Sequence, residues 1–286
     1  MSLGLNKTKR RIASVKSTQK ITKAMGMIAS VKLKRCKDRF DASELYRDRI
    51  RELISKCFYY AKNPSKRFTQ AKEGAKGTLF IVITSNLGLC AGYNSNLLKY
   101  ARTLIDPNND DLLLVGEKGK HHFGRDEAFQ ESIVNLGDIG LGASYRECFK
   151  FAFELMRIWE KARYEKIELI YTHYVNSLRF EPASARLLPI SPEVELPDYE
   201  AYCPPIIEPK AEQVLNRLLP YYLAGSFYNY LSESELSEQS ARRMAMDNAN
   251  DNADELLDKL TIEYNKARQT AITQEIVEVV SGSSNA

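Results

Sequence analysis

The spacing of hydrophobic residues in the last third of the chain predicts a long helix with a coiled-coil seam. From Ala253 onward, small and apolar side chains recur at alternating steps of four and three, which is typical of a coiled coil. The stretch 231–280 contains neither proline nor glycine, so it predicts a helix of about 50 residues and roughly 75 Å. The seam positions are Ala253, Leu257, Leu260, Tyr264, Ala267 and Ala271.

A second long helix is predicted over 7–61, where no proline and only one glycine, Gly26, occur. Its seam also follows steps of three and four, with one stutter that would locally unwind a supercoil. These side chains are smaller and more polar than those of a leucine zipper, so we expect the pairing to need support from outside the seam. Asn63 and Pro64 end the helix, because the residue before a proline is disfavoured in the helical conformation. The seam positions are Val15, Thr18, Thr22, Met25, Ala29, Leu33, Cys36 and Phe40.

The middle of the chain changes from the helical period to continuous apolar runs that predict buried strands. Helical patterns separate these runs, and this alternation indicates a parallel α/β sheet covered on both faces. Six prolines between Pro189 and Pro209 then predict a linker or an extended rim. Helix resumes near Lys210, is interrupted at Pro220 and continues past Gly225. The predicted strands are 78–84, 111–116, 166–172 and 185–190, and the predicted helices between them are 95–105, 119–125 and 143–163.

These elements arrange the chain as a helix, an α/β domain and a second helix. We place the N-terminal helix at 1–62, the Rossmann-like α/β domain at 77–205 and the C-terminal helix at 209–286. Because a globular domain connects the end of one helix to the start of the other, the simplest packing of the helices is antiparallel. The predicted fold class is therefore α/β plus a long antiparallel coiled coil whose two helices bracket the domain.

Charge is distributed unevenly, although the net charge of the 286 residues is only +4. Residues 1–40 carry 12 Lys and Arg against one acid, Asp38, and residues 232–286 carry 11 acids against five bases. Three roles fit the basic segment: binding nucleic acid, a mitochondrial transit peptide, or pairing with an acidic helix near acidic loops of partner proteins. Residues 1–39 hold no aromatic side chain to stack on bases, and the helical pattern is far too long for a transit peptide. We therefore favour pairing, although exposed ion pairs contribute only about 0–1 kcal/mol each.

Composition narrows the class of protein further. No run of 18 apolar residues exists, and the start of the chain lacks the apolar core of a secretory signal. The five cysteines are dispersed without a CxxC pair, so we expect free thiols in a reducing compartment.

The motifs indicate no catalytic, cofactor-binding or metal-binding site. The loop Ser85–Asn94 follows a strand and precedes a helix, where α/β folds bind phosphate, but it lacks the GxGxxG and GxxxxGK[ST] patterns, so we favour a tight turn. The glycines of Gly137–Gly142 favour a flexible loop. His121, His122 and His173 lack the spacing of metal ligands and are expected at the surface or in loops. No nucleophile motif occurs, and we expect no carboxylate in an apolar environment that would raise its pKa for acid–base catalysis.

Segments from both ends and from the middle of the chain resemble the gamma subunit of F-type ATP synthases. The N-terminal match is RIASVKSTQKITKAM at 11–25 followed by MIASVKLKR at 27–35. The loop SNLGLCAGYNSN at 85–96 resembles the signature loop of the family's α/β domain. SEQSARRMAMDNANDN at 237–252 and YNKARQTAITQEIVEVVSG at 264–282 resemble the start and the end of its C-terminal helix.

The resemblance implies a central shaft in a rotary machine. In this family the two long helices form a coiled coil inside a hexamer of alternating α and β subunits, and the α/β domain lies near the epsilon subunit and the membrane ring of c subunits. Proton flow turns the ring and the shaft, and the β sites make or hydrolyse ATP, so the chain needs no catalytic site or cofactor of its own. The implied location is the cytoplasmic face of a bacterial inner membrane, with membrane association only through the complex and no nucleic-acid partner. Two alternatives from the residues alone stay open: a nucleotide-binding α/β enzyme with helical extensions, and a basic coiled-coil nucleic-acid binder.

The resemblance also implies roles for single positions. Met25 and Arg242 correspond to positions that face the coupling loop of a β subunit, and Glu208 corresponds to the foot on the c ring or epsilon. The neighbouring Pro204 and Pro205 depart from the family pattern at this foot. Beyond Ala271, apolar residues shift to another helix face, and we expect this tip to turn in an apolar bearing. The residues expected to touch the catch loops of β are Arg268, Gln269 and Thr273.

Overall fold

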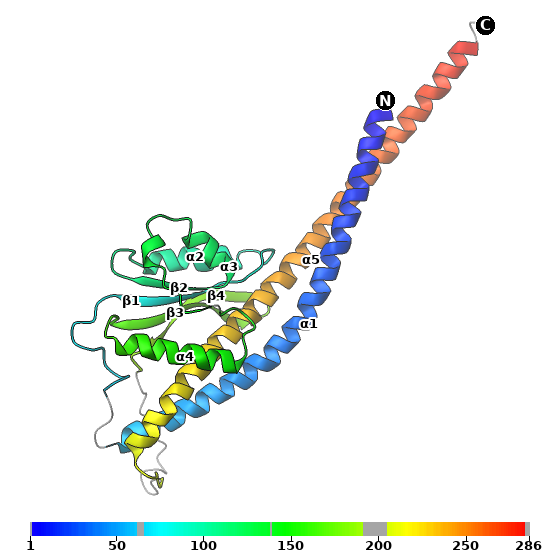
Figure 1. The fold of residues 1–286 in the computed structure, drawn as a ribbon. Helices are drawn as coiled ribbons and strands as arrows, with labels where there is room; N and C mark the ends of the chain where they lie inside the picture. The colour runs from blue at the N-terminus through cyan, green and yellow to red at the C-terminus, as the bar shows by residue number, and fades with distance from the viewer. Residues whose placement is uncertain (1, 62–65, 138, 191–204, 284–286) are drawn as a thin grey trace. The chain divides into compact units, whose positions relative to one another are not determined.

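The computed structural model describes residues 2–61, 66–137, 139–190 and 205–283 (Figure 1). The chain divides into two compact units, one of residues 1–31 with 242–286 and one of residues 32–241. Two long helices contribute to both units: α1 at Ser2–Tyr60 and α5 at Ala211–Ser283. The predicted fold class, two long helices that bracket an α/β domain, is confirmed. The proposed boundaries at 62, 77, 205 and 209 stay predictions.

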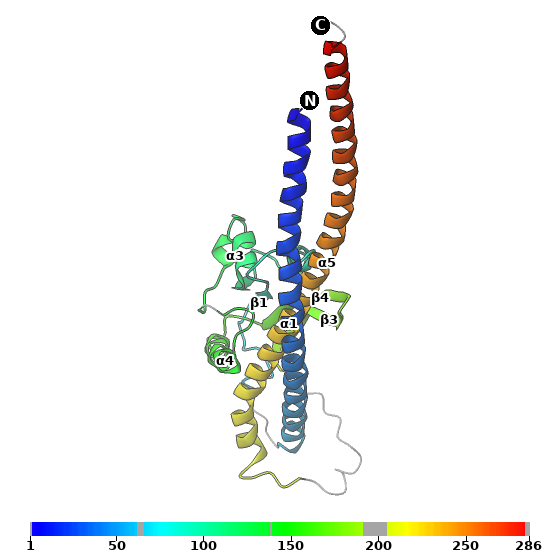
Figure 2. The same cartoon turned by 90° about the vertical axis from the view of Figure 1, so that its right-hand side faces the viewer.

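In the first unit, the helices lie side by side and antiparallel (Figure 2). Gln19 Nε2 donates to Asp254 Oδ1 at 2.6 Å, and Thr22 donates to the side-chain oxygen of Asn250. Residue numbers therefore rise along α1 while those of the partners on α5 fall, which is the pattern of an antiparallel pair. Of the predicted seam of α1, Thr18 is exposed and Gln19 is buried instead, because a helix with 3.6 residues per turn drifts away from a strict heptad.

The second unit is built on a mixed four-stranded sheet with the order β2-β1-β3-β4. The bounds are Thr78–Ile83 for β1, Asp111–Val115 for β2, Lys166–Asn176 for β3 and Arg179–Leu188 for β4. The first three are parallel, as predicted, but β4 is antiparallel to β3 and begins six residues earlier than the predicted strand at 185. A two-residue connection joins β3 to β4, and so short a turn permits only antiparallel pairing.

Helices cover both faces of the sheet (Figure 1). One face packs against α2 (Tyr93–Leu104) and α3 (Glu117–Phe123), and the other packs against α4 (Tyr145–Glu160), α1 and α5. Side chains of β1 alternate between these faces, since successive residues of a strand point in opposite directions. A 3-10 helix at Gln130–Ser132 completes the regular elements that the described residues form. The four cysteines outside 191–204 are free and buried, as expected for thiols.

The lower part of α5 lies in the core of the second unit. Leu219, Leu223 and Phe227 are each at most 1% exposed and pack with strand and α4 side chains. The predicted interruption at Pro220 is wrong, because α5 is continuous through this residue. A proline inside a helix costs about 3 kcal/mol, and burial of two leucines and a phenylalanine, at about 1.5–3 kcal/mol each, offsets this cost. Most of the proline-rich stretch predicted as a linker lies outside the described residues.

Candidate functional site: the anchored helix α5 and its exposed end

The segment 223–242 of α5 is buried on nearly all sides, although many of its side chains are polar. Small side chains let a helix approach two neighbours closely, and this segment carries five serines at 0–4% exposure. The buried serines are Ser226, Ser232, Ser234, Ser237 and Ser240. A helix held in this way cannot turn independently of the α/β domain around it.

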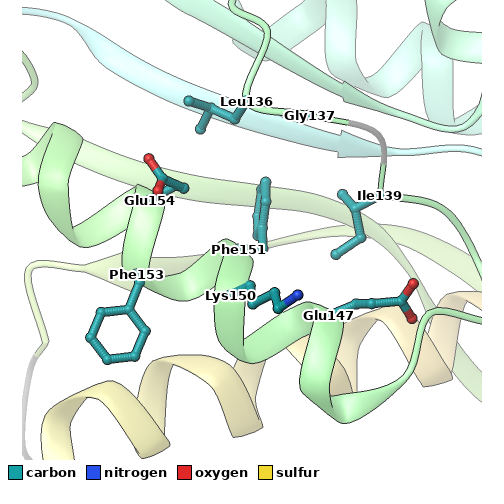
Figure 3. A pocket seen from close by; sticks show the side chains of 8 residues that line it. All are labelled: Leu136, Gly137, Ile139, Glu147, Lys150, Phe151, Phe153 and Glu154. Carbon is teal, nitrogen blue, oxygen red and sulfur yellow. The ribbon is translucent and has the colours of Figure 1, made fainter.

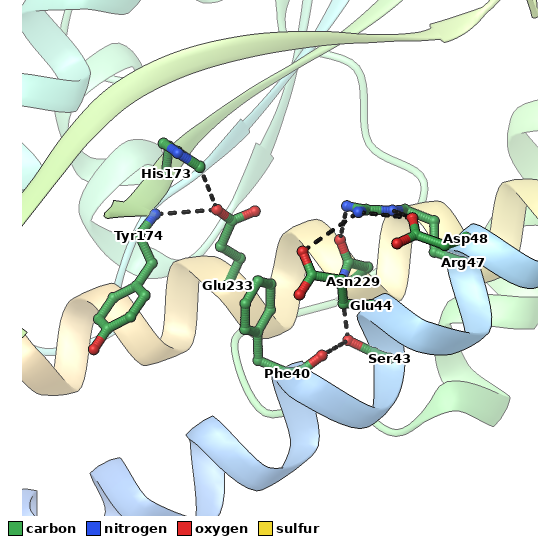
Figure 4. A network of polar contacts seen from close by, with 9 residues as sticks. All are labelled: Phe40, Ser43, Glu44, Arg47, Asp48, His173, Tyr174, Asn229 and Glu233. Carbon is green, nitrogen blue, oxygen red and sulfur yellow. Dashed lines mark hydrogen bonds and ion pairs between the residues drawn. The ribbon is translucent and has the colours of Figure 1, made fainter. Parts of the chain in front are cut away.

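A polar network fastens α5 to α1 (Figure 4). Asn229, fully buried, donates from Nδ2 to Ser43 Oγ at 3.0 Å and accepts from Arg47 Nη1 at 2.5 Å. The Ser43 hydroxyl in turn donates to the carbonyl of Phe40 at 2.8 Å. Arg47 also binds the carboxylate of Asp48 at 3.0 Å, so the side chains of Asn229, Ser43 and Arg47 all have hydrogen-bond partners.

One turn further along α5, Glu233 fastens the helix to the sheet (Figure 4). Its Oε1 accepts from the backbone N–H of Tyr174 at 3.0 Å and lies 2.6 Å from Nδ1 of His173. Glu233 is 3% exposed, and this burial raises its pKa against the opposing effect of the two hydrogen bonds. The expectation that no carboxylate is buried in an apolar environment is therefore wrong at Glu233. His173 lies within β3 and is half exposed.

The signature loop between β1 and α2 is closed by side-chain hydrogen bonds and packs on α5. Asn94 Oδ1 accepts from the backbone N–H of Ser85 at 3.1 Å, and its Nδ2 donates to Ser85 Oγ at 2.7 Å, which closes the loop. Tyr93 is buried, and its hydroxyl donates to the carbonyl of Ser234 at 3.2 Å. Burial raises the pKa of Tyr93, so the phenol stays a neutral donor. Cys90 and Ala241 complete this contact between the loop and the helix.

Beyond the pairing with α1, the end of α5 is exposed. Gln19 of α1 pairs with Asp254 of α5, and α1 begins seventeen residues before Gln19, at Ser2. In an antiparallel pair, the residue opposite Ser2 lies seventeen residues after Asp254, which is Ala271. Apolar side chains beyond this point are 44–72% exposed. They are Ile272, Ile276, Val277 and Val279. A helix end with this much apolar surface is typical of a protein-binding segment.

The structure places the predicted contact residues on three separate segments. Arg268, Gln269 and Thr273 lie exposed near the end of α5, where the hydroxyl of Thr273 donates to the carbonyl of Gln269 at 2.9 Å. Met25 is partly buried and Arg242 is 8% exposed, both in the first unit. Their contact roles stay predictions.

The sixth predicted residue, Glu208, is exposed in the segment just before α5. It belongs to the second unit, and its role as a foot also stays a prediction. The sequence analysis did not identify Asn229 or Glu233, although their four-residue spacing within one predicted helix places both on one face.

A pocket of about 500 Å³ along α4 combines acidic, basic and apolar side chains, as a reaction centre would require (Figure 3). Its carboxylates have structural tasks. Glu147 forms a capping box with Ser144, and those hydrogen bonds lower the pKa of Glu147. Glu154 binds Arg157 at 3.0 Å.

Across the part of the chain that the structure describes, no group of three His, Cys, Asp or Glu could hold a metal ion, and no helix is long and apolar enough to span a bilayer.

Comparison with known proteins agrees with this architecture. A family model described as ATP synthase matches residues 4–285. The ATP synthase gamma chain of Heliobacterium modesticaldum is 36% identical over 98% of this chain and 98% of its own length. That of Moorella thermoacetica is 37% identical over 96% of each chain.

Solved structures give the same result. A chain in the central stalk and c ring of the Tetrahymena thermophila mitochondrial ATP synthase is 27% identical, with a TM-score of 0.58 over 80% of this chain and 99% of that one. A chain in the rotor of the Euglena gracilis mitochondrial ATP synthase is 18% identical, with a TM-score of 0.62 over 95% of this chain and 100% of that one, and supports the fold alone. This chain belongs to the ATP synthase gamma chain family.

Proposed function

We propose that this chain is the central rotor stalk of a membrane-associated F-type ATP synthase and couples ion flow through a c ring to ATP synthesis and hydrolysis at an α/β hexamer. The observation that carries the proposal is the continuity of α5. One helix is anchored in the core of the second unit over 223–241 and is exposed at its far end. Torque applied to the domain therefore reaches the helix through buried contacts rather than through a flexible linker.

The anchoring contacts suit a rotor because they oppose rotation of α5 about its own axis. Asn229 binds α1, Glu233 binds the end of β3, and Tyr93 of the signature loop binds the carbonyl of Ser234. These bonds tie α5 to three other elements, α1, β3 and α2, so rotation of α5 about its own axis would break them. Buried hydrogen bonds contribute about 0.5–1.5 kcal/mol each, and the apolar packing of the core adds to this resistance.

The proposed partners are the subunits that the family resemblance implies. The exposed apolar end of α5, with Arg268, Gln269 and Thr273, turns inside a sleeve of α and β subunits. Met25 and Arg242 face the coupling loop of a β subunit. The second unit binds epsilon and the c ring, with Glu208 at the foot.

In this assembly the chain has no catalytic site of its own, because the β subunits perform the chemistry. It lies peripherally on the cytoplasmic face of the inner membrane and is held there by the complex.

Co-purification tests the proposal. A tagged chain isolated from its native membranes in mild detergent is expected to bring down α, β, epsilon and c subunits in stoichiometric amounts. A chain shortened at residue 260 lacks the exposed end but keeps the second unit, so it is expected to retain epsilon and the c ring and to lose most of the α and β subunits. Recovery of the intact tagged chain without α and β would refute the rotor function.

A further inference from the structure

A second cavity, of about 360 Å³, lies between α2 and α3 and is lined mainly by basic side chains. Five of its eight lining residues carry a cationic or titratable nitrogen, and none is acidic. Lys99 and Arg102 come from α2, and Lys118, His121 and His122 come from α3. None of these five side chains makes one of the contacts that anchor α5, so those contacts do not explain their convergence.

The positive charge of this cavity is only partly neutralised. Arg102 binds the carboxylate of Asp126 and donates from Nε to His122 Nε2 at 3.1 Å. The ammonium groups of Lys99 and Lys118 form no ion pair with any residue that the structure describes. Two unpaired cations that line one concave surface attract an anion more strongly than either would alone, because their potentials add.

Side chains with hydrogen-bond donors also line the cavity. His122 Nε2 accepts from Arg102, so the ring proton of neutral His122 lies on Nδ1 and is available as a donor. Lys118 lies against the signature loop, with its Cε and Nζ within 3.7 Å of the position that a side chain on Gly88 would occupy. A Cβ at this position would make an ordinary van der Waals contact with Lys118. Ser95, in the first turn of α2, adds a hydroxyl to the lining.

We propose that this cavity is a binding site for a phosphate-bearing small molecule, held by Lys99 and Lys118 with donors from His121, His122 and Ser95. The volume lies at the low end of the range for ligand pockets, about 300–1,000 Å³, so it suits inorganic phosphate, pyrophosphate or the phosphate portion of a nucleotide. A concave site between two helices favours a small ligand over an acidic protein surface, which needs a broad and flatter contact. The site is independent of the stalk function and gives the stalk domain a means to sense phosphate compounds.

The three histidines of the chain provide a direct test. The imidazole resonances of the purified full-length chain would be followed by NMR during separate titrations with phosphate, pyrophosphate and ATP, in buffer of constant ionic strength. The resonances of His121 and His122 are expected to shift and saturate, whereas those of His173, which binds Glu233 on another face, are expected to stay in place. Burial and the neighbouring Arg102 lower the pKa of His122, and the other charged or titratable groups around this ring are Asp126 and His121. A bound anion is expected to raise the pKa of His122 again.

Substitution of both lysines distinguishes a built site from general attraction. Lys99→Gln with Lys118→Gln is expected to weaken binding about tenfold, since two partly exposed charges contribute roughly 1.4 kcal/mol together. Lys76→Gln with Lys161→Gln removes the same charge from exposed positions elsewhere on the domain and is expected to leave the affinity unchanged.

Three results would overturn the proposal. The first is the absence of a saturable shift at His121 and His122 with all three ligands. The second is equal weakening by the two double variants. The third is a stronger response to a polyglutamate peptide than to pyrophosphate, which would identify the surface as a contact for an acidic protein.

Discussion

Asn229 offers a sharp test of how α5 is anchored, because one amide joins two side chains of α1. Asn229→Ala removes the donor to Ser43 and the acceptor of Arg47 and leaves the helical backbone intact. Neither neighbour can reach water easily at this position, since Asn229 and Ser43 are buried and Arg47 is mostly covered. The substitution therefore breaks the contact between the helices without removing apolar core.

The expected magnitude follows from these contacts. The bond to the Ser43 hydroxyl contributes about 1 kcal/mol, and the bond from the Arg47 guanidinium contributes about 1.5–3 kcal/mol. In the variant, Arg47 still pairs with the carboxylate of Asp48, so we expect the loss of its bond to Asn229 to cost the lower part of the roughly 1.5–3 kcal/mol range. The higher helix propensity of alanine offsets about 0.5 kcal/mol of this loss. The net loss is about 2–3 kcal/mol of the free energy of unfolding, a large part of the 5–15 kcal/mol typical of a domain.

Urea unfolding followed by tryptophan fluorescence measures this loss in the second unit, to which Asn229 belongs. Trp159 is the only tryptophan of the chain, is 1% exposed, and lies in the core that α5 shares. With a denaturant slope of about 2–3 kcal/mol per molar urea, the midpoint of Asn229→Ala is expected about 1 M below that of the parent chain.

Asn96→Ala is the matched control, since Asn96 is an exposed helical asparagine of the same unit. Its midpoint is expected to stay within about 0.3 M of the parent chain. Equal midpoints for Asn229→Ala and Asn96→Ala would refute the anchoring role of the amide.

Three further predictions concern other positions. Burial raises the pKa of Glu233 above 4.5, so the folded state binds this proton more tightly than the unfolded state does. The contribution of Glu233 to the free energy of unfolding therefore falls as pH rises from about 4.5 through the folded-state pKa. Urea unfolding of Glu233→Gln at a series of pH values is expected to show no such decrease. Met25→Lys is expected to leave assembly intact but to lower ATP synthesis per ion translocated in reconstituted vesicles. Gly26→Ala is expected to raise the melting temperature measured by circular dichroism, since a Cβ there meets Met246 at an ordinary 3.4 Å and alanine favours helix by about 0.5–1 kcal/mol.

Each of these has a control or a contrary outcome. Glu127→Gln, at an exposed carboxylate, should keep the pH dependence, and an unchanged dependence in Glu233→Gln as well would rule out the buried carboxylate as its source. Met27→Lys places the same charge on a side chain that is 66% exposed, and equal coupling in the two lysine variants would contradict the position assigned to Met25. A lower melting temperature for Gly26→Ala would mean that the helices at Met246 lie too close for a methyl group.

The elements and the seams were predictable because they depend on local periodicity. Continuous apolar runs identified the first three strands, and the seam correctly placed Ala29, Cys36 and Phe40 among the buried residues of α1. The break of the apolar seam at Ala271 matches the point opposite which the partner helix ends. These features repeat every two or 3.6 residues, and so a single sequence contains them.

The direction of β4 and the continuity of α5 depended on contacts between distant segments. A strand pattern carries no information about the direction in which it pairs, and only the two-residue connection to β3 made β4 antiparallel. Pro220 predicts a helix break from local chemistry, but Leu219 and Leu223 bury their side chains on both sides of it and hold the helix together.

By itself, the sequence determined the two long helices, the α/β domain between them and, through its motifs, the family. Only the tertiary structure decided which side chains anchor α5 and which basic residues converge between α2 and α3. The physical reason is that periodicity reports burial on one face. Over 223–242, α5 is buried on several faces at once, so its serines, Asn229 and Glu233 follow no apolar period. Their partners, Ser43 and Tyr174, are distant in the chain and become neighbours only when the helices and the sheet pack together.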